Sequence, residues 1–372
     1  METLFIFAFC AICMFASEAM DRKAKDRLFI FCLCLLAMLS GFRYQGGSDF
    51  SVYQNIYDYI PTMPKVFALS KNDFKYEMGY VYLCSFFKTF GISFYGFLVI
   101  HALFFYFCLW YGFRKYTNRY GILILVFLYK LFFYNTFISM RQSITIAGFF
   151  LIFPYIEQKK WLKYFIGCYI LSRFHNGAYL LFLLYPLAYF KLTRTKVIWL
   201  NIIFVPTIVL GLAGVDVMGP LGNFLASQAS TDGELERVDR YFQNDNLSPI
   251  GIFHTLEYFL LMFFVVKNYR KIEHLNAHVQ IVLKMFLCLL PLFTLFRASE
   301  ILTREKDYFS IFYAIILYYL TEIDHGKYRL LVLAGTCLIC AFGYYRFLYL
   351  FDNGALWYYE SWLGQPFCSF FY

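Results

Sequence analysis

Long apolar runs, most of them closed by lysine or arginine, are the feature of this sequence that most constrains its fold. A run of about 17–25 apolar residues is long enough to cross the hydrocarbon core of a bilayer as one helix. The 372 residues are 61% hydrophobic and 15% charged, whereas soluble domains are about 45–50% apolar and about 25% charged. The sequence therefore predicts an all-α, polytopic membrane protein.

The apolar runs predict about 11–13 transmembrane or re-entrant helices, in one integral membrane domain over residues 1–372. The segment 76–92 is apolar enough to enter a membrane, but it is short and carries Glu77 and Lys88. We expect it to be an interfacial or re-entrant helix. The expected spans are 2–19, 28–42, 93–113, 121–138, 141–156, 162–174, 176–190, 196–214, 251–267, 279–296, 308–324 and 329–349.

The net charge of +9 is spread over short clusters between the apolar runs. That pattern is typical of cytoplasmic linkers and does not favour nucleic-acid binding. If 76–92 does not cross the membrane, both termini and the loops 43–76 and 215–250 lie outside. The start lacks a basic n-region, which predicts a retained first helix. Six basic linkers then share the cytoplasmic side: 21–27, 114–119, 157–160, 191–196, 267–271 and 324–329.

With this topology, the polar residues at the opposite helix ends all face outward. A charge at bilayer depth is unfavourable by about 2.5–3.5 kcal/mol on insertion scales, so a bound anion is one candidate for offsetting it. The residues are Arg43, Asp49, Glu77, Arg141, Gln142, Arg173, His175, Asn176, Asp239, Arg240, Tyr241, Arg297, Glu300 and Arg304.

Two of these residues have both a structural and a functional interpretation, and the sequence does not decide between them. Arg141 opens a helix, so it either extends to lipid headgroups or forms a fork of donors for phosphate oxygens. His175, in SRFHNGA beside Arg173, is either a packing residue or a group that moves a proton near neutral pH.

Two further segments are open in the same way. The charges at 297, 300, 304 and 307 are spaced for one helix face, which fits either a self-neutralising surface ladder or the floor of a site. The long polar loop 215–250 has two interpretations. It either binds glycan, because Asp239, Arg240 and Tyr241 suit sugar hydroxyls, or it is a solvated loop without a binding role.

The stretch GFRYQGGSDFSVYQNIYDYI (41–60) follows an apolar run. Gly46 and Gly47 permit a tight turn that places Asp49 beside Arg43. Tyr53 and the other tyrosines either form an interfacial belt or stack on sugar rings. The cysteines, almost all inside apolar runs, are interpreted as small apolar residues, and no metal site is expected.

An ordered set of motifs resembles the Wzy/EpsG family of bacterial polysaccharide polymerases over roughly residues 1–325. The motifs are RYQGGSDF with its trailing tyrosines, KYEMGY, MRQSITIAGFFL, SRFHNGAYLLF and DYFSIFY. The sequence departs from the family's usual histidine corner, F-H-[KS]-[ST]-A, at Asn176. The role of that residue is therefore open.

The resemblance implies polymerisation of O-antigen, capsule or exopolysaccharide repeat units at the outer face of the bacterial cytoplasmic membrane. The donor and acceptor would be glycans on undecaprenyl pyrophosphate, and the architecture would be similar to the GT-C class, without a cofactor or required metal. Membrane lipids, a chain-length regulator and a flippase are the further candidate partners.

Residue roles follow as expectations. Arg141 with Arg297 or Arg304 would bind the pyrophosphate, helped by Gln142, Arg173 and Glu300. Arg43 would hold the Asp49 turn or a second phosphate. Asp49, Glu77 and His175 are the candidate general bases. The rival functions are a polysaccharide flippase or other transporter, which favours polar groups near the midplane, and an O-antigen ligase-type transferase.

Overall fold

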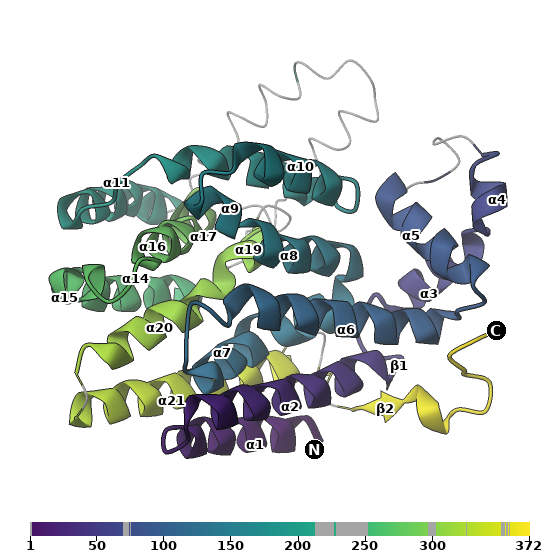
Figure 1. The fold of residues 1–372 in the computed structure, drawn as a ribbon, viewed down its shortest axis with the longest axis horizontal. Coiled ribbons are helices and arrows are strands. Elements are labelled where there is room, and N and C mark those ends of the chain that lie inside the picture. Colours follow the sequence, from purple (N-terminus) through teal and green to yellow (C-terminus); the bar gives the residue numbers. More distant parts are fainter. Residues whose placement is uncertain are drawn as a thin grey trace. The chain divides into compact units, whose positions relative to one another are not determined.

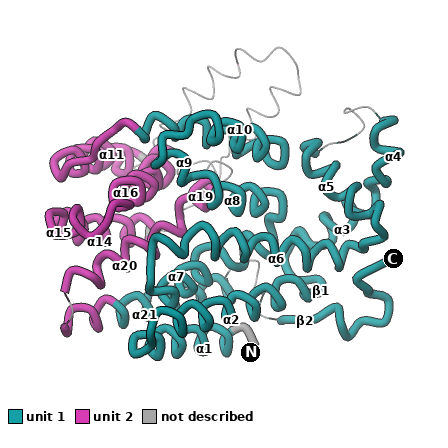
Figure 2. Tube along the Cα trace, viewed as in Figure 1, with its two compact units in different colours: residues 1–188, 333–372 teal, residues 189–332 magenta. Residues whose placement is uncertain are grey.

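The computed structural model describes residues 2–69, 74, 76–212, 227, 252–296, 303–324, 326–350, 354, 356 and 358–372. It is 77% helical and nearly all-α, as the apolar runs predict. The chain forms two compact units, one of residues 1–188 with 333–372 and one of residues 189–332 (Figure 2).

The first unit is a layered helical bundle whose helices follow the expected apolar runs within a few residues. Helix α2 packs against α6, α6 against α8, and α8 against α10, while α1 packs against α7 (Figure 1). Its helices are α1 (Glu2–Ser17), α2 (Arg22–Gly41), α6 (Phe94–Phe113), α7 (Tyr120–Phe127), α8 (Met140–Ile152), α9 (Pro154–Glu157), α10 (Trp161–Ser172) and the 3-10 segment η4 (Asn176–Ala188).

The helix α7 continues as two π-helical stretches, η2 (Leu128–Phe132) and η3 (Tyr134–Ile138). The wider turns end at Ser139, whose backbone leaves the helical region before α8 begins. This break makes Met140 and Arg141 the first turn of a new helix. Arg141 therefore lies in the first turn of α8 and not in the middle of a long helix.

Three helices fill the segment expected as loop 43–76 and the short apolar segment after it. They are α3 (Phe50–Tyr59), α4 (Met63–Val66) and α5 (Met78–Thr89). Helix α3 lies within the segment expected as an external loop, and its buried side chains recur at helical spacing and pack with Tyr80 of α5. The Lys88 ammonium of α5 binds the last carbonyls of α3, on Tyr57, Asp58 and Ile60.

The C-terminal segment returns to this group of helices. Strand β2 (Glu360–Ser361) pairs antiparallel with β1 (Arg43–Tyr44), and the 3-10 turn η6 (Trp362–Gly364) follows. The Trp362 indole donates to the Gly41 carbonyl at 3.0 Å, and the Phe370 carbonyl accepts from Ser93 N at the start of α6 at 3.0 Å. The last residues thus hold the ends of α2 and α6.

The second unit is also helical, with a core of aromatic contacts such as Tyr258 against Phe286. The helix α21 (Lys327–Leu350) starts here and continues into the first unit. The other helices are α11 (Arg194–Leu212), α14 (Ile252–Lys267), α15 (Tyr269–Glu273), α16 (Val279–Leu287), α17 (Leu289–Thr294), α19 (Asp307–Ser310) and α20 (Phe312–Glu322).

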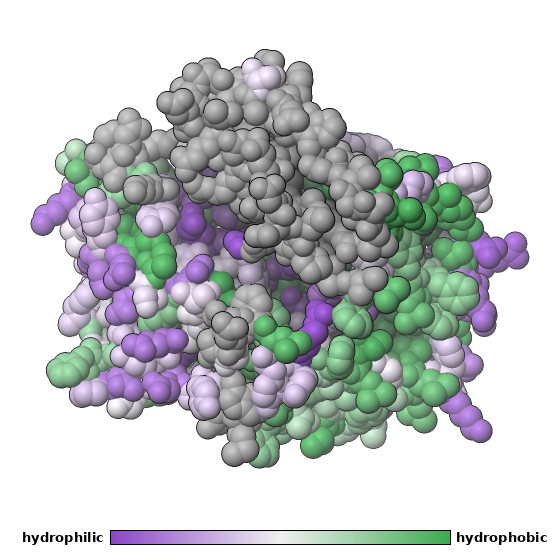
Figure 3. All heavy atoms as spheres, turned by 180° about the vertical axis from the view of Figure 1, so that it is seen from behind, coloured by the Kyte–Doolittle hydropathy of each residue, from purple (hydrophilic) through white to green (hydrophobic). Residues whose placement is uncertain are grey.

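Two helices in the described part of the chain, Phe94–Phe113 and Lys327–Leu350, are by length and composition able to cross a membrane. Shorter apolar helical segments cover Leu4–Ser17, Tyr120–Phe132, Asn176–Ala188 and Val279–Thr294. The surface carries broad hydrophobic areas (Figure 3). On α21, for example, Leu331 and Leu338 are 70% and 72% exposed.

Candidate active site

Three side chains from distant motifs meet at one corner of the first unit. Arg141 donates from Nη1 to Glu77 Oε2, which makes an ion pair. The other carboxylate oxygen, Oε1, accepts from the backbone N–H of Asn176 at 3.2 Å and lies 3.7 Å from His175 Nδ1. Glu77 therefore joins the guanidinium to the imidazole, and we call Glu77, Arg141 and His175 the corner triad.

Each member of the corner triad lies where a helix begins or ends. Glu77 directly precedes α5, Arg141 is in the first turn of α8, and His175 lies in the turn between α10 and η4. The unsatisfied N–H groups at helix starts carry partial positive charge. A carboxylate at this point is therefore favourable for α5 and α8 as well as for Arg141.

The α5 start and the α10–η4 turn touch at their backbones. Gly79 N donates to the Arg173 carbonyl at 2.9 Å. A Cβ at position 79 would lie 2.6 Å from that carbonyl oxygen, so only glycine allows this approach. The close contact makes the motifs KYEMGY and SRFHNGA adjacent in the fold, and it brings Glu77 within reach of His175 and Asn176.

Aromatic side chains surround the Arg141 guanidinium. Its central carbon lies 5.2 Å from the ring centre of Tyr76, and its charge interacts with the Tyr53 hydroxyl. The side chain is 26% exposed, although its Nε is buried without a hydrogen-bond partner among the described residues. The guanidinium is therefore oriented by Glu77 and the tyrosines, and only its exposed part can donate to an anion.

The pKa of Glu77 shows which role its carboxylate can take. Burial raises this pKa, but the neighbouring His175 imidazole and the Arg141 charge lower it by more, to about 2. The carboxylate is thus ionised at neutral pH and is a weak proton acceptor. Its contacts suit it to orient Arg141 and His175.

His175 is the triad member whose position suits proton transfer. Its Nδ1 lies 3.7 Å from Glu77 Oε1 and is buried without a hydrogen-bond partner among the described residues, so a proton on Nδ1 would point toward the carboxylate. Nε2 then keeps a lone pair for a substrate hydroxyl, as in other sites where a carboxylate orients a histidine. The side chain is 26% exposed, so a substrate can approach it.

Comparison with known proteins identifies the chain. The model of the EpsG family matches residues 26–361. The chain belongs to the EpsG family. No curated protein and no solved structure matches it. Family membership indicates a polysaccharide polymerase, and together with the apolar helices it indicates a membrane protein.

The EpsG opening motif is arranged differently from the expectation. Arg43 is 1% exposed and donates from Nη1 to the Ser40 carbonyl, and its guanidinium carbon lies 5.3 Å from the ring centre of Phe137. It makes no ion pair with Asp49. The expected Arg43–Asp49 pairing is wrong, because the two glycines serve another contact.

That contact is the approach of the opening motif to η3. A Cβ at Gly46 would lie 3.1 Å from the Phe137 ring. Gly47 has a φ of +96°, and a Cβ there would lie 2.6 Å from the Phe137 carbonyl oxygen. The glycines thus bring the motif close to Phe137. Asp49 instead takes the position before α3, where its side chain makes no capping hydrogen bond.

Other expected site residues of this EpsG protein lie outside the corner triad or are buried. Gln142 is 2% exposed and accepts from Ser139 Oγ, and Tyr53 is 5% exposed, so neither offers a surface to substrate in this arrangement. Arg173 is exposed, with its guanidinium carbon 4.3 Å from the Tyr169 ring centre. Asp239, Arg240, Tyr241, Arg297 and Glu300 lie outside the described residues.

Arg304 belongs to the second unit and is partly exposed. Beside it the structure shows a carboxyl that our sequence analysis did not single out. Glu305 is 7% exposed, and burial together with Asp307 raises its pKa to about 8. Its position in the run of charges gave no sign of this burial.

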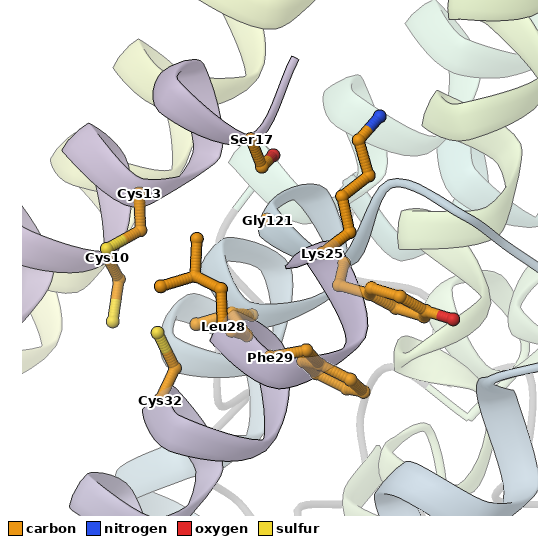
Figure 4. A pocket seen from close by; sticks show the side chains of 10 residues that line it. Cys10, Cys13, Ser17, Lys25, Leu28, Phe29, Cys32 and Gly121 are labelled. Carbon is orange, nitrogen blue, oxygen red and sulfur yellow. The ribbon is translucent and has the colours of Figure 1, made fainter. Parts of the chain in front are cut away.

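A hollow between α1, α2 and α7 is lined by thiols and apolar groups (Figure 4). Cys10 and Cys32 point toward one another there, and Lys25 lies at the same hollow. Its lining includes no member of the corner triad. The eleven cysteines are free thiols, which fits their interpretation as small apolar residues.

Proposed function

We propose that this protein polymerises lipid-linked oligosaccharide repeat units on the outer face of the bacterial cytoplasmic membrane. The growing glycan on undecaprenyl pyrophosphate is transferred to the sugar of a single lipid-linked unit. The observation that carries the proposal is the corner triad, because it combines an anion-binding guanidinium with an oriented imidazole. The multi-pass, GT-C-like arrangement of about 11–13 helices and the independence from metal belong to this proposal.

The chemistry divides between two members of the triad. The Arg141 guanidinium stabilises the negative charge that develops on the departing lipid pyrophosphate. His175 Nε2 accepts the proton of the acceptor hydroxyl as that oxygen attacks the anomeric carbon of the donor sugar. Glu77 orients the Arg141 guanidinium and the His175 imidazole. Arg304, Arg297, Glu300 and the 239–241 segment remain candidates for further substrate contacts.

The decisive experiment is a polymerisation assay with His175→Ala. We expect single lipid-linked repeat units to accumulate, with activity about a hundredfold lower, in a protein that still folds. Tyr179→Phe is the matched control, because Tyr179 is a partly exposed residue of the same segment that is not in the triad. Normal polymer length from His175→Ala would exclude His175 as the base.

Deletion of the gene separates the proposed reaction from its rivals. A polymerase leaves single-unit surface glycans when it is lost. A flippase leaves no surface glycan, and an O-antigen ligase leaves polymer still attached to its lipid. The crowding of Glu77, Arg141 and His175 at helix ends, and not near the middle of the helices, favours the polymerase.

A further inference from the structure

The exposed face of α5 is aromatic. Tyr82, Phe86 and Phe90 are 40%, 47% and 64% exposed and follow one another at intervals of four, so they form one stripe along the helix. The opposite face is buried, with Tyr80, Val81 and Cys84 all 0% exposed. The helix thus has one face packed into the core and an opposite, apolar face that is largely exposed in the described part of the chain.

The stripe extends to the neighbouring helix α4. Phe67, just after α4, is 69% exposed, and its ring centre lies 5.8 Å from that of Tyr82. Lys65 is exposed on the same short helix. Aromatic rings with a nearby lysine are typical of a surface in the headgroup region of a bilayer, where the rings enter the acyl boundary and the cation meets phosphates.

Helix α3 of the same group provides an internal comparison. Its exposed residues Ser51, Asn55 and Asp58 recur at helical spacing and form one polar stripe, beside which Val52 and Tyr59 are 51% and 70% exposed. Both helices contribute buried aromatic residues to one core, so they belong to one folded group. The Ser51–Asn55–Asp58 stripe suits solvent, whereas the Tyr82–Phe86–Phe90 stripe of α5 suits hydrocarbon.

Length and connection place α5 at a membrane boundary. Its twelve residues measure about 18 Å at 1.5 Å per residue, whereas the hydrocarbon core is about 30 Å thick. Glycine at 91 with a φ of +73° turns the chain, and α6, one of the two long apolar helices, begins at Phe94. A helix too short to span and joined by a tight turn to a spanning helix suits the interface.

We propose that the Tyr82–Phe86–Phe90 stripe, with Phe67, is a membrane-docking surface that rests in the headgroup–acyl boundary of the outer leaflet. Its occupant is the lipid bilayer itself. The consequence that follows rests on the proposed function. Because Glu77 directly precedes α5, docking holds the corner triad at the depth where a lipid-linked pyrophosphate lies.

Spin-label accessibility in lipid vesicles tests the docking. In a variant with all eleven cysteines replaced, a nitroxide is attached at Phe86→Cys or, as the matched control, at Asn55→Cys. The protein is reconstituted in phosphatidylethanolamine–phosphatidylglycerol vesicles. We expect the label at 86 to collide with oxygen and to lose access to a water-soluble nickel chelate, and the label at 55 to show the reverse.

Two results would overturn the proposal. Access of the nickel chelate to the label at 86 would show that the stripe faces water, and shielding from both reagents would show that another protein surface covers it. Phe90→Cys repeats the measurement if the first label prevents folding. None of these outcomes depends on enzymatic activity, so failure of the docking surface is distinguishable from failure of the proposed function.

A polymerisation assay then tests the consequence for catalysis. Phe86→Asp should lower polymer formation from lipid-linked units while the corner triad remains intact, and Asn55→Asp, which adds the same charge to the water-facing helix, should not. Equal activity of both variants would show that docking does not position the triad.

Discussion

Two arginines of the first unit that lie within the quoted motifs, Arg43 and Arg141, occupy opposite environments. Arg141 is 26% exposed, paired with Glu77 and bordered by Tyr76. Arg43 is 1% exposed, has aromatic neighbours and hydrogen-bonds the Ser40 carbonyl. Burial lowers the pKa of Arg43 to about 10. An arginine that is oriented yet accessible can serve chemistry, whereas a sealed arginine serves the fold.

The largest effect is expected from Arg141→Lys. Lysine keeps the charge but loses the planar pair of donors, so polymerisation should fall by about a thousandfold. The measurement is the rate of polymer formation by reconstituted protein. Arg119→Lys is the matched control, because Arg119 also forms an ion pair, with Glu18, but lies outside the corner triad. Normal polymer from Arg141→Lys would show that Arg141, like Arg43, has no catalytic role.

Glu77→Gln should affect stability as well as activity. The pKa of Glu77 falls from 4.5 to about 2 on folding, which corresponds to at most about 3 kcal/mol of favourable interaction. Because the folded pKa is the lower one, this contribution is present above pH 4.5 and is lost as the pH falls toward 2.

The measurement is the melting temperature in detergent between pH 7 and pH 3. Glu77→Gln should melt lower than the native protein at pH 7, and the difference should shrink as the pH falls. Glu18→Gln, which removes the carboxylate of the Arg119 ion pair, serves for comparison. A pH-independent difference between Glu77→Gln and the native protein would mean that the carboxylate is not ionised as described.

Gly79→Ala tests the backbone contact that assembles the corner triad. Alanine is about 1 kcal/mol better than glycine in a helix, so propensity alone predicts a more stable protein. The 2.6 Å approach to the Arg173 carbonyl oxygen opposes this, and the clash should destabilise the fold by about 1–3 kcal/mol. Gly335→Ala is the control, since no atom of the described residues that surround the helix lies within 4 Å of a Cβ there. Equal melting temperatures for the two variants would contradict the contact.

The sequence located the long apolar helices but did not predict the contacts between them. Apolar runs locate α2, α6, α8 and α21 within a few residues, because hydrophobic length determines a helix in a membrane. The helix α3 was missed although its apolar residues recur at helical spacing, since its tyrosines were interpreted as a belt or as sugar contacts. The pairing of Glu77 with Arg141 joins residues 64 apart, and no local pattern predicts such a contact.

The same reasoning explains the failure at the opening motif. Two adjacent glycines predict backbone freedom, and a turn that returns Asp49 to Arg43 is one use of it. The structure uses that freedom to bring Gly47 against the Phe137 carbonyl. Gly47 approaches Phe137, which lies in a distant segment of the chain. A glycine in the sequence therefore indicates a close contact but does not show which residue it contacts.

The smallest effect is expected from Arg43→Met. Methionine fills much of the same space, and it avoids burying a charge that has no carboxylate partner among the described residues. Loss of the cation–π contacts with Phe50 and Phe137 offsets that gain, so stability should change by only about 1 kcal/mol. Polymerisation should stay within a few-fold of the native rate, whereas Arg43→Ala should destabilise the fold through the cavity it leaves. If Arg43→Met melts normally but makes no polymer, Arg43 acts on the substrate, and burial is then not what separates the two arginines.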